Sequence, residues 1–292
     1  MLLATVLLWA LGIVVTRYIV TNGFEPLAYA TIRYGAAIVL FVAYTWWRER
    51  TFRIARRDLR YVAIAAAMIF LNQLCFTNSA HLTSASTLAL LLGTTPIFVG
   101  IIATVVGLEH PSRAFWVAAV VSFGGVALIA VGARGSFSGA LLGDLLAVAT
   151  AATWGAYSVS IVPLMRSYSP YRISSVVLPL GWIPLALVSI PQLAEQTVDG
   201  FGWTMTVALV YSVVGPLFLT TILWFTAIAR VGPSRATLFA NLEPFFAVLF
   251  AVLLLSESLS GLEIAGGAAI AAAIMIERRG VRSPEAVPVL GE

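Results

Sequence analysis

Long apolar segments follow one another along almost the whole chain, and this pattern constrains the fold more than any other feature. Soluble domains carry roughly 25% charged residues, whereas only 10% of this chain is charged and 60% is hydrophobic. A helix needs about 20 apolar residues to cross the hydrocarbon core of a bilayer. The sequence therefore predicts an all-α integral membrane protein with ten transmembrane helices, at residues 2–20, 27–46, 61–80, 84–106, 114–133, 143–164, 173–192, 203–229, 233–255 and 261–276.

The arginines indicate how these helices are oriented. All 17 basic residues are arginines, and Arg17 and Arg33 fall inside predicted helices, while Arg134 faces one side. The other 14 face the opposite side: Arg48, Arg50, Arg53, Arg56, Arg57, Arg60, Arg113, Arg166, Arg172, Arg230, Arg235, Arg278, Arg279 and Arg282. Because basic loops stay on the cytoplasmic side, we expect both termini in the cytoplasm and the chain in the inner (cytoplasmic) membrane. Residues 277–292 would form a cytoplasmic tail, and Glu25, Glu195, Asp199 and Glu257 would lie outside.

The two halves of the chain resemble each other at fixed spacings. Pro96 precedes Glu109 by 13 residues, and Pro244 precedes Glu257 by the same distance. Trp9 and Trp154 occupy matching places upstream of the two prolines. Each half would hold five helices, an odd number, so the second copy would enter the membrane inverted. We therefore predict a first five-helix repeat at 1–133 and an inverted second repeat at 143–276, with a substrate site near the midplane between them.

One motif in the ninth predicted helix is similar to a known family. It reads Asn241-Leu242-Glu243-Pro244-Phe245-Phe246-Ala247, and Glu257 and Gly266-Gly267 follow it. This pattern resembles the EamA-type repeat of the drug/metabolite transporter superfamily. The first half keeps Pro96, Glu109 and Gly124-Gly125 but has Thr95 in the place of Glu243. The resemblance implies a ten-helix transporter with both ends in the cytoplasm, and its amino-acid and metabolite exporters of the YddG type are the branch we favour.

The predicted function is secondary transport of small metabolites by alternating access, with export as the expected direction. Amino acids, including aromatic or other apolar ones, are the expected substrates, and a drug or a nucleotide-linked metabolite is the alternative cargo. An intramembrane enzyme and a passive channel are the alternatives from other classes. The chain has only His81 and His110 as histidines and shows no paired acids, metal-ligand spacing or phosphate-binding loop. We therefore expect no catalytic residues, metal or cofactor, and no nucleic-acid partner. The lipid bilayer and a small-molecule substrate are the expected partners of a monomer.

Charged and polar residues inside apolar helices are the candidates for the substrate site, because placing them in lipid is costly. Glu243 would bind a substrate amine or a proton, or else serve a structural role. Arg33 would pair with a substrate carboxylate or with Glu243. Adjacent Asn72 and Gln73 suit either substrate binding or hydrogen bonds between helices.

Aromatic residues far from the membrane surfaces complete the prediction. Trp9 and Trp154 would stack on a flat substrate or pack between helices. The full set of predicted substrate-binding residues is Trp9, Arg33, Asn72, Gln73, Thr94, Trp154, Tyr157, Ser158, Tyr211, Trp224, Asn241 and Glu243. Pro96 and Pro244 are predicted hinges, because proline removes a backbone hydrogen bond from a helix.

Overall fold

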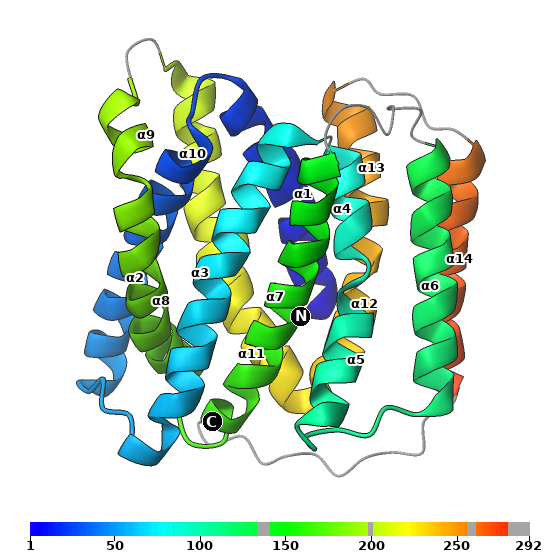
Figure 1. Ribbon diagram of the computed structural model, residues 1–292, viewed down its shortest axis with the longest axis horizontal. Helices are drawn as coiled ribbons and strands as arrows, with labels where there is room; N and C mark the ends of the chain where they lie inside the picture. Colours follow the sequence, from blue (N-terminus) through cyan, green and yellow to red (C-terminus); the bar gives the residue numbers. More distant parts are fainter. Residues whose placement is uncertain (84, 133–140, 198–200, 256–260, 280–292) are drawn as a thin grey trace.

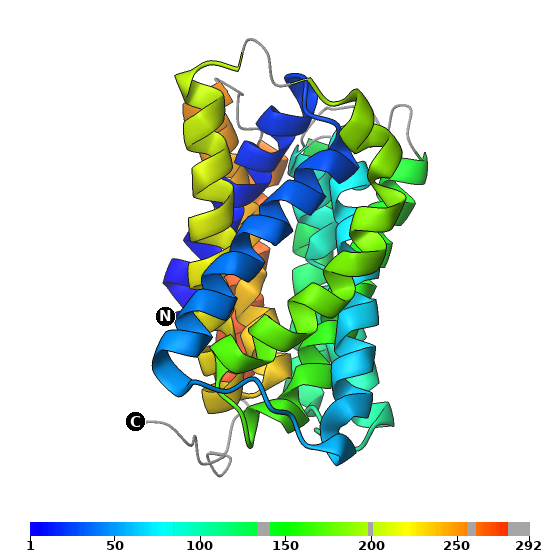
Figure 2. The same cartoon turned by 90° about the vertical axis from the view of Figure 1, so that its left-hand side faces the viewer.

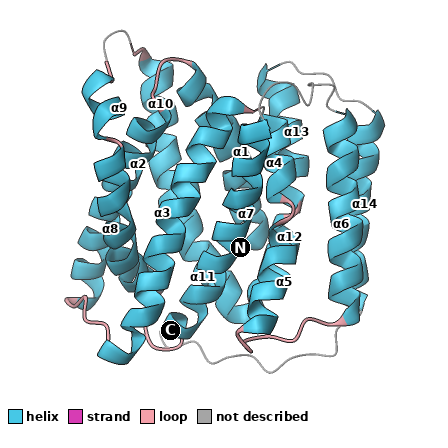
Figure 3. Cartoon of the chain, viewed as in Figure 1, coloured by secondary structure: helices cyan, strands magenta, loops and turns pink. Residues whose placement is uncertain are grey.

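The computed structural model describes residues 1–83, 85–132, 141–197, 201–255 and 261–279. Every regular element in these ranges is a helix, and none of them contains a strand (Figure 3). The all-α prediction is therefore confirmed for the described part of the chain. Arg134, Asp199, Glu257 and most of the predicted tail lie outside the described residues.

The helices follow one another with short connections. In chain order they are α1 (Leu2–Thr21), α2 (Pro26–Glu49), η1 (Arg56–Asp58), α3 (Leu59–Leu82), α4 (Ala85–Leu92), α5 (Thr95–Val105), α6 (Arg113–Gly132), α7 (Leu141–Met165), α8 (Pro170–Val188), α9 (Ile190–Glu195), α10 (Trp203–Val213), η2 (Val214–Leu219), α11 (Thr220–Val231), α12 (Pro233–Ala240), α13 (Leu242–Leu255) and α14 (Gly261–Arg279). Each of the ten apolar segments predicted from the sequence coincides with helical structure.

Six continuous helical stretches in the described part are long and apolar enough to cross a membrane. They are Leu2–Thr21, Pro26–Glu49, Arg56–Leu82, Leu141–Met165, Pro170–Val188 and Trp203–Val231. Large apolar side chains such as Val39, Val105 and Leu253 point away from the bundle, as a lipid-facing surface requires. The molecule is a multi-pass membrane protein.

Several of the predicted spans contain more than one helical element, and the two that hold the predicted hinges are each divided into a pair of shorter helices. Residues 85–105 contain α4 and α5, which are separated at Gly93 and Thr94, and residues 233–255 form α12 and α13, which are separated at Asn241. Pro96 and Pro244 lie in the first turns of α5 and α13, where a missing N–H costs no helical hydrogen bond. The prolines therefore follow two helix interruptions and do not kink two continuous helices.

The two interrupted helices pack against each other in opposite directions. Helix α4 packs on α13, and α5 packs on α12 (Figure 1). Helices α6 and α14 form a close pair at one edge of the bundle. A Cβ added to Gly125 of α6 would lie 2.6 Å from the carbonyl oxygen of Gly266 in α14, so this pair depends on the absence of a side chain.

The predicted cytoplasmic arginines gather at one end of the bundle. The α2–α3, α5–α6, α7–α8 and α11–α12 connections all lie at the lower end in Figure 1, and Figure 2 shows the α2–α3 connection crossing that end. Eleven of the arginines that the sequence assigned to the cytoplasm occur in or beside these connections, from Arg48 to Arg235. Which side of the membrane this end faces stays a prediction.

Candidate functional site

A cavity of about 130 Å³ opens among the two helix interruptions and the helices around them. Its wall comes from both halves of the chain: Trp9, Gly12, Ile13, Thr16, Arg33, Tyr34, Ile69, Asn72, Gln73, Phe76, Leu92, Gly93, Thr95, Thr150, Trp154, Tyr157, Leu178, Pro216, Leu217, Thr221, Thr237, Ala240, Asn241 and Glu243. A cavity of about 150 Å³ holds benzene, so the space suits a small metabolite. A mostly apolar wall with a few polar groups is typical of small-molecule sites.

Arg33 is the buried cation of this cavity. It is 7% exposed, and its guanidinium donates to Gln73 Oε1 at 2.6 Å and to the Tyr29 hydroxyl at 3.4 Å. The rings of Tyr29, Tyr34 and Phe76 surround it, with centroids 5.1 to 5.8 Å from Cζ. Within the described chain no carboxylate forms an ion pair with Arg33, and its Nε has no hydrogen-bond partner. The predicted Arg33–Glu243 pair is therefore not formed.

Asn72 and Gln73 extend the contacts of Arg33 across the bundle. Gln73 Nε2 donates to Asn72 Oδ1 at 2.8 Å, and Asn72 Nδ2 donates to the Thr150 carbonyl of α7 at 3.0 Å. Both amides also line the cavity. The predicted hydrogen bonds between helices are therefore formed, and substrate binding by these two side chains stays a prediction.

Glu243 is the acidic residue of the wall. It is the second residue of α13, directly after the interruption at Asn241, so the positive end of the α13 dipole lies beside its carboxylate. In the described chain no hydrogen bond or ion pair engages that carboxylate. Asn241 is fixed instead, because its amide donates to the Ser122 hydroxyl of α6.

The two interruptions present equivalent positions to the cavity. Counted back from Pro96 and from Pro244, the wall residues are Thr95, Gly93 and Leu92 in the first half and Glu243, Asn241 and Ala240 in the second. Thr94 and its counterpart Leu242 do not line the cavity. The register of the two helix breaks is the same.

Aromatic rings form the wall on the side of α1 and α7. The rings of Trp9 and Trp154 meet edge to face with centroids 5.4 Å apart, and Tyr157 lies 5.4 Å from Trp154. Trp9 Nε1 donates to the Pro216 carbonyl at 3.1 Å. This contact leaves the ring faces as the part of these side chains that suits an apolar or flat group.

Four of the predicted site residues lie outside the wall. The Thr94 hydroxyl donates to the Leu91 carbonyl, and the Tyr211 hydroxyl donates to the Leu8 carbonyl. Ser158 is fully buried, and its hydroxyl has no partner within the described residues. Trp224 is also buried, with its ring 4.9 Å from that of Trp9. Trp224 therefore supports the wall from behind.

Several wall residues were not predicted, because apolar side chains and glycines do not stand out in an apolar sequence. Tyr34, Phe76, Leu178 and Leu217 are examples. Pro216 had a usable signal, since Gly215-Pro216 lies in the middle of a predicted span. It lies in η2, a π-helical turn, and such turns often mark functional sites. Gly12 allows α1 to pack closely against Pro216, because a Cβ at Gly12 would lie 2.9 Å from Pro216 Cβ.

The carboxylate of Glu109, which belongs to the first half, contacts the first turn of α12. Glu109 accepts hydrogen bonds from the backbone N–H and the hydroxyl of Ser234. Gly232 has φ of +83°, and a Cβ there would overlap the Glu109 carboxylate. The Gly232-Pro233-Ser234 turn is thus shaped to receive Glu109, which fixes one end of an interrupted helix to the opposite half.

A helical multi-pass bundle that encloses a small cavity with a few polar groups in its wall has the architecture of a membrane transporter. The family comparison agrees: the model of the EamA-like transporter family matches residues 1–131 and again 141–277. The chain belongs to this family.

Curated relatives carry transporter names. An "uncharacterized transporter" of Archaeoglobus fulgidus is 24% identical over 88% of this chain and 89% of its own length. Two proteins of Bacillus subtilis, the uncharacterized transporters YdfC and YetK, are 29% and 22% identical over 63% and 77% of this chain, and 59% and 69% of their own lengths. One solved structure, described as "Crystal structure of protein", shares the fold with a TM-score of 0.73 at 20% identity, over 95% of this chain and 96% of that one.

Proposed function

We propose that this protein is a secondary transporter that moves small zwitterionic metabolites, amino acids above all, out of the cell across the cytoplasmic membrane. One observation carries this proposal. Arg33 and Glu243 line the same cavity from different helices, and neither has an ion-pair partner in the described chain. Burying a charge is costly unless it is paired. A ligand with one negative and one positive end satisfies both groups.

In this proposal each part of an amino acid has a suitable partner in the wall. The forked guanidinium of Arg33 suits a carboxylate, because two parallel charge-assisted hydrogen bonds form in that geometry. Glu243 suits the ammonium group. The rings of Trp9, Trp154 and Tyr157 suit an aromatic or other apolar side chain. The cavity of about 130 Å³ is small for a nucleotide-linked metabolite, which favours the amino acid.

Alternating access follows in this proposal from two inverted five-helix repeats, at 1–133 and 143–276. The double match of the family model and the equal register of the two helix interruptions support it. The crossed packing of α4 on α13 and α5 on α12 also supports it. The ten helices would all cross the membrane, with both termini and the arginine-rich end in the cytoplasm. The interruptions before Pro96 and Pro244 would be the hinges. A single chain supplies the whole wall, so we propose a monomer as the functional unit.

Counterflow in proteoliposomes tests the proposal. Vesicles that contain the purified protein are loaded with an unlabelled amino acid, and uptake of the labelled one is followed at increasing concentrations. We expect uptake that saturates, requires the internal amino acid and is absent from protein-free vesicles. A flux that never saturates would indicate a channel, and a product of altered mass would indicate an enzyme. Saturable uptake of a drug or a nucleotide-linked metabolite, with no amino acid transported, would replace the proposed substrate.

A further inference from the structure

The segment from Trp46 to Arg60, which links α2 to α3, presents an unusual concentration of positive charge; we refer to it as the arginine-rich connection. Six arginines occur in it, and all six are exposed: Arg48, Arg50, Arg53, Arg56, Arg57 and Arg60. Among these six, only Arg57 has an acidic partner within the described chain, Asp58, at 3.8 Å. The charges therefore face outward with little compensation.

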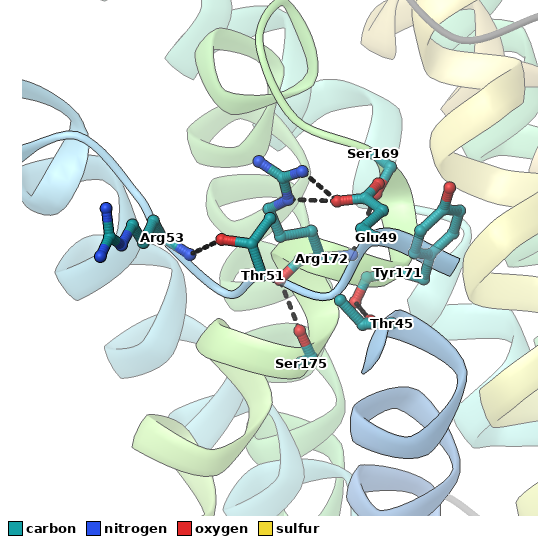
Figure 4. A network of polar contacts seen from close by, with 8 residues as sticks. All are labelled: Thr45, Glu49, Thr51, Arg53, Ser169, Tyr171, Arg172 and Ser175. Carbon is teal, nitrogen blue, oxygen red and sulfur yellow. Dashed lines mark hydrogen bonds and ion pairs between the residues drawn. The ribbon is translucent and has the colours of Figure 1, made fainter. Parts of the chain in front are cut away.

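The two acidic residues of the connection are turned inward. Glu49 forms an ion pair with Arg172 of α8 (Figure 4), and its side chain is 16% exposed. Asp58 accepts a hydrogen bond from the Tyr168 hydroxyl at 2.7 Å, and its side chain is 15% exposed. Because both carboxylates are occupied by the α7–α8 region, the outer face of the connection is cationic.

The connection is also held in a defined shape. The Tyr168 hydroxyl accepts the backbone N–H of Ala55 at 3.0 Å and, as described, donates to Asp58. Ile54 packs on the main core, and Arg50 ends α2 in the left-handed conformation with φ of +55°. An anion that binds here meets a prearranged surface and orders little additional chain.

Exposed tryptophans place this surface at the edge of the membrane. Trp46 and Trp47, in the last turn of a membrane-spanning candidate helix, are 51% and 66% exposed. The guanidinium of Arg50 lies over the Trp46 ring and that of Arg48 over the Trp47 ring, with centroids 5.6 and 5.7 Å away. Tryptophan is enriched where the hydrocarbon core meets the headgroups. The arginines thus lie at the depth of lipid phosphates.

We propose that the arginine-rich connection binds the headgroups of anionic phospholipids. Guanidinium groups recognise phosphate oxygens through paired charge-assisted hydrogen bonds, and clusters of four to eight basic residues next to a transmembrane helix are suited to anionic lipid. This inference goes beyond the proposed transport function and does not depend on the substrate.

Lipid binding to the solubilised protein tests the inference. The protein is titrated with dansyl-labelled phosphatidylglycerol or with phosphatidylcholine of the same chain length, and energy transfer from tryptophan reports binding. We expect clearly tighter binding of phosphatidylglycerol. The preference should fall in about 1 M salt, where the Debye length shrinks to about 3 Å.

A pair of matched double variants locates the surface. R53Q/R56Q removes two charges from the connection, and R113Q/R166Q removes two exposed charges from other connections at the same end. Each basic residue near an anionic surface contributes about a fivefold gain in affinity. We therefore expect R53Q/R56Q to weaken phosphatidylglycerol binding roughly 10- to 25-fold, and R113Q/R166Q to weaken it far less. Thermal unfolding of both variants should match that of the parent.

Three results would overturn the inference. The first is equal affinity of the parent protein for the two lipids. The second is an equal loss in both double variants, which would assign binding to the overall charge of that end. The third is displacement of the lipid by an equal concentration of glycerol phosphate, which would indicate a site for soluble phosphates.

Discussion

The helix interruptions of the two halves share a register but differ in chemistry. Thr95 and Glu243 occupy the same position relative to the following proline, and both face the cavity. The Thr95 hydroxyl is engaged by the Leu92 carbonyl, whereas the Glu243 carboxylate is unengaged within the described chain. The neighbouring helices also differ, because α2 contributes Arg33 to the wall and α8 contributes Leu178. The two halves thus contribute different groups to one wall, an arginine from the first and a glutamate from the second.

The largest effect should come from a substitution of Glu243, the acidic residue at the second interruption. We expect Glu243→Gln to reduce transport roughly 10- to 150-fold, because a hydrogen bond to a charged group contributes about 1.5–3 kcal/mol. The initial rate of counterflow measures the effect, and size-exclusion chromatography checks the fold. Full activity of the glutamine variant at every pH would show that the difference from Thr95 has no mechanistic meaning.

Transport should depend on the shape of the Arg33 side chain as well as on its positive charge. Arg33→Lys keeps the charge but loses the fork that bonds to Gln73, so we expect the half-saturation concentration for amino acids to rise about 10-fold. Matched amines that lack the carboxylate should be transported equally by both proteins. If lysine supports normal half-saturation, Arg33 acts only as a structural cation.

The contact between Glu109 and the turn at the start of α12 allows a comparison of stability. Gly232→Ala places a side chain at φ of +83° and against Glu109, so we expect the free energy of unfolding to fall by about 1–3 kcal/mol. The matched control is Gly202→Ala at the start of α10, where φ is −76° and no atom lies within 4 Å of the added Cβ. Thermal unfolding in the same detergent measures the stability of both variants, and equal shifts of the unfolding temperature would contradict a stabilising role for the Glu109 contact.

The smallest effect separates two adjacent threonines in the first interruption. Thr94 and Thr95 each donate to the carbonyl three residues earlier, at 2.7 and 2.6 Å, but only Thr95 lines the cavity. We expect Thr95→Val to change the half-saturation concentration by about two- to fivefold, the value of one modest hydrogen bond. Thr94→Val should leave that concentration unchanged. A larger change at Thr94 would mean that the wall has another register in the membrane.

The helices could be predicted from the sequence because apolar length determines them almost alone. Arg33, Asn72, Gln73 and Glu243 could also be singled out, since a polar residue in an apolar helix is conspicuous for its cost. Their lining of one cavity depends on packing between distant segments, which no local pattern encodes.

The predicted site residues that lie outside the wall have a common physical explanation. Thr94 was chosen over Thr95, although the position of the helix break decides which of the two faces inward. Tyr211 and Trp224 are polar aromatics in apolar helices, like Trp9, yet one bonds to the Leu8 carbonyl and the other packs behind the wall. The rotation of each helix about its axis was the missing quantity.

The hydrogen-bonded chain that begins at Arg33 links this side chain of the first half to α7 in the second half. Every donor in it points the same way: the guanidinium donates to Gln73, Gln73 donates to Asn72, and Asn72 donates to the main chain of α7. A displacement of α7 relative to α3 by more than about an ångström would break the last of these bonds. The guanidinium would then lose its orientation, and its affinity for a substrate carboxylate would fall. The movement of one half relative to the other would therefore itself promote release of the substrate.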